Sequence, residues 1–257
     1  MRRVRSIPAM VALPIVLVVL WWVVTLGNTN PFIPKPETLM TDLWETWVGP
    51  RFFSDVLPSI TRLLSGLLIA VIAGIVLGVL IGSNLTVRKL TGPILEFVRS
   101  IPPPVLLPVL MMVIGIGDET KVFLIALGCL WPVLLNTVDG VRSADPVLRD
   151  TTSSYNIAGL TRLRYFVLPA ALPRMVTGIR LSLPIALILM VASEMYAATN
   201  GLGFSIIYFQ RTFQNGPMWA GVVVLGLVGI IMALLFRWLE RRLLSWYYAQ
   251  RQLESAA

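Results

Sequence analysis

The sequence has no histidine, one cysteine and few charged residues, with Asp, Glu, Lys and Arg making up 13% of its 257 residues. A soluble domain carries about 25% charged residues, so this chain lacks the polar surface that a water-exposed fold needs. The absence of histidine excludes His-ligated zinc or haem and Ser-His or Cys-His catalysis. The single Cys129 excludes an intramolecular disulfide and a cysteine-ligated iron–sulfur cluster, and we expect it to be a small buried apolar residue.

Apolar residues predominate instead, since 56% of the chain is hydrophobic and its mean hydropathy is +0.81. A helix needs about 20 mostly apolar residues to cross the hydrocarbon layer of a bilayer. Six long runs are nearly free of charge: Ile7 to Gly27, Leu63 to Gly82, Ser100 to Ile116, Val122 to Val138, Leu181 to Thr199 and Met218 to Phe236. The sequence therefore predicts an all-α polytopic membrane protein with six transmembrane helices.

The basic residues are divided unequally between the two sides of such a bundle. With the N-terminus in the cytoplasm, five of the 21 Lys and Arg residues fall on the outer side: Lys35, Arg51, Arg62, Lys121 and Arg211. The other sixteen fall inside, which is a strong positive-inside asymmetry. We therefore interpret the net charge of +8 as a topology signal rather than a nucleic-acid-binding surface, and expect both termini in the cytoplasm.

Two connecting segments are long enough to have a role of their own. The outer segment, Asn28 to about Ile60, is partly amphipathic and is predicted either to lie on the outer membrane surface or, more simply, to pack as a strap around the bundle. The inner segment, residues 140–173, is polar and basic yet still helix-forming. We expect one transmembrane domain over residues 1–257, with the first helix and outer segment in 1–57 and the core of the bundle in 58–245.

Glycines recur at every fourth residue in the second run, at Gly74, Gly78 and Gly82, so that another backbone can approach one face of that helix. Gly221, Gly226 and Gly229 form a weaker version in the sixth run. Either stripe is compatible with a subunit interface, but an internal helix contact is favoured because polytopic proteins contain many such pairs.

The third run opens with Arg99-Ser-Ile-Pro-Pro-Pro104 and must kink or start irregularly, because proline has no amide donor. Irregular backbone at membrane depth is tolerated where it is buried in protein or lines a wet cavity. Pro103 and Pro104 are thus candidates for the translocation pathway, the alternative being a kink with no role in transport.

Glu194 is an acid well inside a predicted span, next to Ser193. An acid in lipid is costly, so its carboxylate should face the bundle interior or a cavity and have a partner. It is predicted to be either a pathway or gate residue, or a structural acid held by hydrogen bonds. Ser193, Asn136 and Ser182 are further polar candidates for the pathway.

The inner segment, residues 140–173, reads Asp150-Thr-Thr-Ser-Ser-Tyr-Asn156, followed after nine residues by Phe166-Val-Leu-Pro169. This spacing resembles the EAA loop of ABC-importer permeases, whose pattern is E-A-A, three residues, G, nine residues, then I-x-L-P. Stretches such as GPILEFVRSIPPPVLLPVL and ASEMYAATNGLG are similar to permeases of the nitrate, sulfonate, taurine and bicarbonate importer family. The likeness extends from about Pro58 to Phe213.

The loop departs from the pattern at four positions. Asp150 replaces Glu, Thr151 and Thr152 replace the two Ala, and Asn156 replaces Gly. Asn adopts the left-handed backbone conformation more readily than most residues, so we expect the turn to persist, with Gly159 giving extra freedom.

The resemblance implies a coupling helix between the fourth and fifth transmembrane helices that docks on an ATP-binding subunit, and we therefore call residues 140–173 the coupling loop. The residues that it implies for this coupling are Asp150, Thr151, Thr152, Asn156, Gly159, Leu168 and Pro169. It further implies two ATPase subunits, a second permease copy, identical or paralogous, and an extracytoplasmic binding protein in the cytoplasmic membrane, with no nucleic acid.

No G-x-x-x-x-G-K-[ST] loop occurs in the chain, so ATP and Mg²⁺ belong to the partner ATPase and this subunit is expected to be no enzyme and to carry no cofactor. A small anion such as a sulfonate, taurine or nitrate is the implied substrate. An ion- or proton-coupled carrier that uses Glu194 is the alternative, although no internal repeat supports it. A membrane enzyme is disfavoured, because no acid cluster or nucleophile–base pair lies within the spans.

Overall fold

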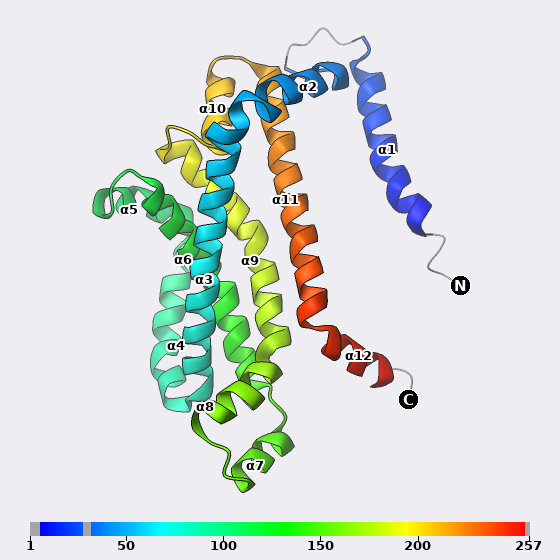
Figure 1. Cartoon of the computed structure of the whole chain (residues 1–257). Helices are drawn as coiled ribbons and strands as arrows, with labels where there is room; N and C mark the ends of the chain where they lie inside the picture. Colours follow the sequence, from blue (N-terminus) through cyan, green and yellow to red (C-terminus); the bar gives the residue numbers. More distant parts are fainter. Residues whose placement is uncertain (1–5, 28–31, 255–257) are drawn as a thin grey trace. The chain divides into compact units, whose positions relative to one another are not determined.

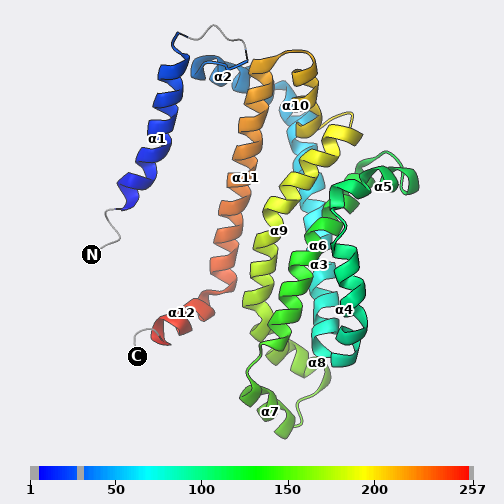
Figure 2. The same ribbon diagram turned by 180° about the vertical axis from the view of Figure 1, so that it is seen from behind.

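The computed structural model describes residues 6–27 and 32–254, and every regular element in these ranges is helical. The chain divides into two compact units, one formed by Met1–Pro58 with Asn200–Leu227 and the other by Ser59–Thr199 with Val228–Ala257. The ribbon in Figure 1 follows the helices along the chain, and Figure 2 shows them from behind.

The first unit contains the N-terminal helix and the outer segment. Its elements are α1 (Ser6–Thr25), α2 (Pro36–Asp42), the π-helical turns η1 (Leu43–Val48) and η2 (Phe52–Val56), α10 (Leu202–Arg211) and the start of α11 (Asn215–Leu243). Trp47 is 1% exposed, and its indole N–H donates to the carbonyl of Pro217 at 2.9 Å. Gly221 allows this approach, because a Cβ atom there would lie 2.5 Å from Cζ2 of Trp47. The outer segment thus packs against the beginning of α11.

The second unit holds the coupling loop and most of the buried polar residues. It begins within α3 (Leu57–Ser83), whose first two residues belong to the first unit. Its further elements are α4 (Leu85–Arg99), the 3₁₀ turn η3 (Pro103–Leu106), α5 (Leu107–Val113), α6 (Asp118–Arg142), α7 (Pro146–Ser154), α8 (Gly159–Arg162), the π-helical turn η4 (Leu163–Val167), α9 (Leu168–Ala197), the end of α11 and α12 (Ser245–Glu254).

Within the described ranges, four helical segments are long and apolar enough to cross a membrane: Phe52–Ser83, Asp118–Arg142, Gly159–Tyr196 and Asn215–Leu243. A fifth is obtained if α4 and the segment Pro103–Val113, which meet at a bend of 78°, count as one broken span. The described residues therefore form an all-helical polytopic membrane protein with four to five candidate spans. The helix α1 coincides with the first predicted run, Ile7 to Gly27, but is not among these spans.

The third run differs from its prediction as a single span over Ser100 to Ile116. The irregular start at the prolines is confirmed, but α5 ends at Val113 after seven residues, which is about 10 Å of helix and too short to cross a bilayer. The segment Leu85–Arg99, which lies between two of the predicted runs, is the helix α4. Its first turn is capped by Asn84, whose side chain accepts hydrogen bonds from the amides of Thr86 and Val87.

Helices α3 and α6 pack through the glycine face of α3, so the predicted internal contact is confirmed. A Cβ atom on Gly74, Gly78 or Gly82 would lie 2.6 to 2.9 Å from a side chain of α6, and Gly66 extends the same face. The opposing residues on α6 are Ile125, Val133, Thr137 and Val141. Gly226 of the weaker stripe has no atom within 4 Å of its Cβ position, so it takes no part in such a contact.

Helices α6 and α9 also approach closely, because each contributes glycines. A Cβ atom on Gly140 would lie 2.9 Å from the carbonyl oxygen of Ala171, and one on Gly178 would lie 2.6 Å from that of Pro132. Cys129 lies in this contact with 0% exposure, as expected for a small buried residue. Helix α6 therefore forms the centre of the second unit, between α3 and α9 (Figures 1 and 2).

Candidate functional site

The coupling loop contains a short helix, α7, with clear start and stop signals. Asp145 precedes Pro146 and its side chain accepts a hydrogen bond from the amide of Val147 at 2.8 Å, which is an N-cap followed by proline at the first helical position. The three residues that replace E-A-A lie on this helix. Asp150 and Thr151 are exposed, whereas Thr152 is 9% exposed.

Asn156 ends α7 in the left-handed conformation, with φ of 57°. The amide of Asn156 donates to the carbonyl of Ser153, and the amide of Ile157 donates to that of Thr152 at 2.8 Å. These two bonds form a Schellman motif, the usual C-terminal stop of a helix with glycine at this position. The expectation that the turn persists with Asn in place of Gly is confirmed.

After this turn the chain re-enters a helix that continues into α9. Gly159 has φ of 59° and begins α8, and the helical segment Gly159–Tyr196 is continuous through η4. Leu168 and Pro169 lie in the first turn of α9, directly after the π-helical turn. Pro169 has no backbone N–H to donate to the preceding turn. The π-helical turn before it is wider than an α-helical turn and accommodates a proline at this position. The last part of the coupling loop, from Gly159 onward, and α9 thus form one continuous helical segment.

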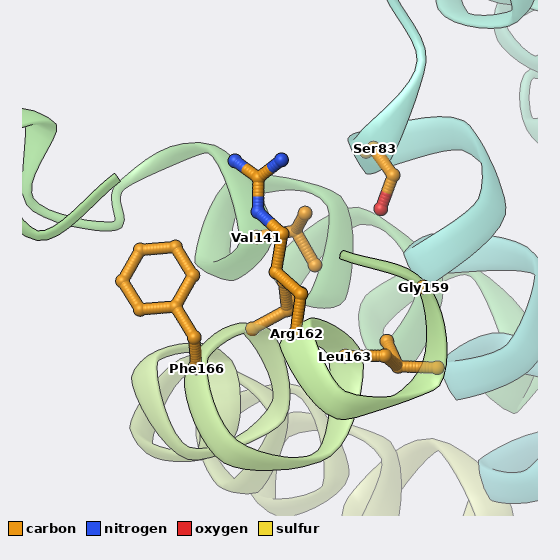
Figure 3. A pocket seen from close by; sticks show the side chains of 8 residues that line it. Ser83, Val141, Gly159, Arg162, Leu163 and Phe166 are labelled. Atoms are coloured by element: carbon orange, nitrogen blue, oxygen red, sulfur yellow. The ribbon is translucent and has the colours of Figure 1, made fainter. Parts of the chain in front are cut away.

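A cavity of about 290 Å³ lies between the start of this helical segment and the ends of α3 and α6 (Figure 3). Its lining combines Ser83 at the end of α3, Val141 of α6, and Gly159, Arg162 and Phe166 of the α8–η4 segment. In Figure 3 the guanidinium group of Arg162 extends past Val141 away from the helix that carries it. The start of this helical segment is therefore not packed solidly against the ends of α3 and α6.

Several large side chains of the coupling loop are exposed. Tyr155, Leu160 and Tyr165 are 76%, 78% and 70% exposed, and Val147 on α7 is 70% exposed. Apolar side chains on a loop that carries basic residues are typical of a surface that a partner covers.

A buried cluster of polar groups joins α3, α6 and α9. We call Ser59, Arg62, Asp118, Lys121 and Glu194 the ion cluster. The hydroxyl of Ser59 donates to both carboxylate oxygens of Glu194 at 2.8 Å, and Nη1 of Arg62 donates to Oε1 of Glu194 at 2.8 Å. Glu194 is 0% exposed and Arg62 is 4% exposed, so this ion pair is withdrawn from solvent.

Arg62 also reaches the first residue of α6. Its Nε and Nη2 atoms lie 2.9 and 2.8 Å from Oδ1 of Asp118, and Nζ of Lys121 donates to the same oxygen at 3.0 Å. Asp118 is 61% exposed, so one side of the cluster borders the surface. Two cations and two carboxylates balance, and the cluster carries no net charge.

The sequence predicted that Glu194 needs a partner but did not identify Arg62, which was counted with Lys121 among the charges outside the spans. Both cations are buried on helices, at 4% exposure. The available signal was the position of Arg62 directly before the apolar run that begins at Leu63, where a helix can extend past its apolar part.

The other candidate pathway residues lie in different surroundings. The buried hydroxyls of Ser182 and Ser193 donate to backbone carbonyls, those of Cys129 and Gly178 for Ser182 and that of Met190 for Ser193. Asn136 donates to the carbonyl of Pro132 at 2.8 Å. These contacts are internal to the bundle of α6 and α9.

Pro103 and Pro104 form the start of η3. A Cβ atom on Gly128 of α6 would lie 3.3 Å from Cγ of Pro103, so the irregular backbone packs against α6. The structure brings Glu194 and Ser59 together but does not gather all six candidate pathway residues at one place.

Two further polar groups were not singled out from the sequence. Asp55, 3% exposed, accepts from Arg51 at 3.1 Å and from the amide of Gly201 at 2.8 Å. Glu240, 5% exposed, pairs with Arg180 and accepts from the hydroxyl of Tyr248 at 2.9 Å. That hydrogen bond to Glu240 raises the pKa of the Tyr248 phenol. The contacts of Asp55 with Gly201 and of Glu240 with Arg180 join residues 146 and 60 positions apart, so no local pattern indicated them.

Comparison with known proteins identifies the family. Residues 66–245 match the family described as "Binding-protein-dependent transport system inner membrane component". The chain is 34% identical over 240 residues to the taurine transport system permease protein TauC of Escherichia coli K12, covering 90% of this chain and 87% of TauC. It is 28% identical to the nitrate import permease protein NrtB of Leptolyngbya laminosa, covering 93% and 88% of the two chains.

The fold is also found in a solved transporter. A chain of the MetNI methionine ABC transporter in an inward-facing conformation superposes with a TM-score of 0.64 at 18% identity, covering 80% of this chain and 98% of that chain. Membership of the family implies a separate ATPase and a substrate-binding protein as partners, and the permease component itself catalyses no reaction and carries no cofactor. The chain belongs to the family of inner-membrane components of binding-protein-dependent transport systems and is a multi-pass ABC-importer permease subunit.

Proposed function

We propose that this chain lines the translocation pathway of an ATP-driven importer for a small anion of the sulfonate or nitrate class. The names of two relatives, a taurine permease and a nitrate permease, support this substrate class. The charge balance of the ion cluster supports it as well, because Glu194 is neutralised by Arg62 and presents no unpaired negative charge to an anion.

We further propose that the importer contains two permease copies, two ATPase subunits and an extracytoplasmic binding protein, and that α7 docks on the ATPase. The observation that carries this proposal is the connection from α7 through the Asn156 turn into the single helical segment Gly159–Tyr196. A displacement of α7 by the ATPase would pass through the short turn of residues 155–158 to Gly159, and beyond this turn the helical segment has no break before the end of α9. Asp150, Thr151 and Thr152 would form the docking face, and Leu168 and Pro169 would lie at the start of the transmitted motion.

The translocation pathway is proposed to run beside the broken span. The irregular backbone at Pro103 and Pro104, between α4 and α5, is of the kind that lines cavities in membrane proteins. Asn136, Ser182 and Ser193 would support its walls from α6 and α9. We propose that Glu194 is a structural acid rather than a gate, because both of its oxygens accept hydrogen bonds at 2.8 Å in a fully buried position.

The proposed topology has six crossings, with both termini in the cytoplasm, and one transmembrane domain. The six crossings are the four long segments, the broken span formed by α4 with Pro103–Val113, and α1. Cysteine labelling tests it, because the native Cys129 is buried and gives little background. We expect Ser154→Cys in the coupling loop to react with an impermeant maleimide only after the membrane is opened, and Thr212→Cys to react in intact cells. The reverse pattern would overturn the orientation.

The function itself is tested by purifying the tagged chain from its native membrane and reconstituting the complex. We expect a co-purifying ATPase whose activity is stimulated by a liganded binding protein, and ATP-dependent uptake of a labelled sulfonate or nitrate. Isolation of the chain without any ATPase, together with uptake driven by an ion gradient, would overturn the proposal.

A further inference from the structure

Helix α4 packs less closely than its neighbours in the second unit. None of its fifteen residues, all of which the structure describes, is buried. Leu90, Ile94 and Phe97 recur at helical spacing and are 70%, 64% and 71% exposed. An apolar stripe of this kind on a membrane protein is compatible with contact to lipid chains.

A cavity of about 260 Å³ is lined by residues of α4, of α6 and of the end of α3. We call it the α4 cleft. Its floor is apolar and includes Ile81, Leu134 and Val138, which belong to one buried cluster, together with Leu95 on α4. Gly92 borders the cleft, and a Cβ atom built on it would have no neighbour within 4 Å. The cleft is therefore open beside Gly92, in contrast to the glycine face of α3.

The rim of the α4 cleft is rich in arginine. Three arginines line it, Arg88, Arg99 and Arg142, against two acids, Glu96 and Asp139. Arg142 lies 3.8 Å from Asp139, whereas no ion pair among the described residues includes Arg88 or Arg99. Three positive and two negative charges leave a net charge of +1 on the lining.

The two arginines of α4 mark the two ends of the cleft. They are eleven residues apart, which is three turns and about 16 Å along the helix, and so lie on one face. Arg88 is one turn past the start of α4, close in sequence to Gly82, whose contact with Val141 is near the end of α6. Arg88 and Arg142 are therefore at the same end of the helix pair.

We propose that the α4 cleft binds an anionic phospholipid, with the headgroup phosphate at Arg88 and an acyl chain over Gly92 and Leu95. A basic rim beside an apolar floor, between helices of a membrane protein, matches both parts of such a lipid. Guanidinium groups suit the phosphate oxygens, with which they form charge-assisted hydrogen bonds. This proposal does not depend on the transported substrate or on coupling to ATP hydrolysis.

The test is native mass spectrometry of the purified full-length chain with added phosphatidylglycerol, compared with phosphatidylcholine. We expect phosphatidylglycerol to be retained in preference, Arg88→Gln to weaken its binding about fivefold, and Gly92→Leu to displace it by filling the cleft. Glu96→Gln should act in the opposite direction and strengthen binding, because it removes a negative charge from the rim.

Matched controls distinguish a site from general contact with lipid. Gly226→Leu also places a side chain in open space on a membrane helix, and Arg241→Gln removes an exposed arginine outside the cleft. Both should bind phosphatidylglycerol as the unaltered chain does. Equal retention of the two lipids, or equal losses in the cleft and control variants, would overturn the proposal. Displacement of the lipid by millimolar inorganic phosphate would also overturn it and assign the cleft to a soluble anion.

Discussion

The two ends of the helices α3, α6 and α9 are built differently. At one end the ion cluster joins the three helices through polar contacts of 2.8 to 3.0 Å, and its members are buried except for Asp118. At the other end α7 and its turn expose large side chains, and a cavity of about 290 Å³ lies behind them. The first end satisfies its polar groups within one chain, whereas the second leaves surface for a partner. We call the first the cluster end of the three helices and the second the loop end.

The largest effect on stability is expected at the cluster end. Arg62→Met should destabilise the protein by about 3–5 kcal/mol, because it leaves Glu194 buried without its cation. Thermal unfolding in detergent would measure this loss. Combining it with Glu194→Gln should restore part of the stability, since the uncompensated charge is removed. Equal stability of the single and double variants would show that the pair is not coupled.

The glycine face between the two ends should respond to added volume. Gly78→Ala should cost about 1–3 kcal/mol, because its Cβ atom would lie 2.6 Å from Cβ of Thr137 and the helices would have to separate. Gly226→Ala serves as the control and should be neutral or slightly stabilising, since it has open space and gains helix propensity. Unfolding of both variants under the same conditions provides the comparison. Equal effects would contradict the packing argument.

At the loop end, a change in backbone strain should affect coupling to the ATPase more than global stability. Asn156→Val places a β-branched residue at φ of 57° and should cost about 1–2 kcal/mol locally, whereas Asn156→Gly should be tolerated. In the reconstituted complex, we expect the Val variant to lose binding-protein-stimulated ATPase activity and the Gly variant to keep it. Full stimulation in the Val variant would separate the turn from coupling.

The smallest effect is expected from the start of α7. Asp145→Ala removes the side-chain acceptor for the Val147 amide and should cost about 1 kcal/mol. Hydrogen exchange should become faster in the first turn of α7 while the amides of α6 and α9 remain protected. Asp145→Asn is the matched control and should retain the cap. Faster exchange throughout the second unit would mean that the two ends are not independent.

The coupling loop was largely predictable because its signals are local. A proline after Asp145, the residue types at Asp150 to Thr152 and the tolerance of Asn156 for positive φ all act within a few residues. The ion cluster was predictable only in part. Burial of an acid requires a partner, but Arg62 lies 132 residues away from Glu194 in the chain.

The sequence by itself determined the apolar helices, the glycine face of α3 and the turn that ends α7. These follow from run length, the spacing of small residues and backbone preference, which are properties of short segments. Only the tertiary structure decided that Ser100 to Ile116 is broken, that α4 is a helix beside an open cleft, and that Arg62 joins Glu194 to Asp118. These features depend on which distant helices meet, because a buried charge or an unfilled volume is defined by all the elements around it.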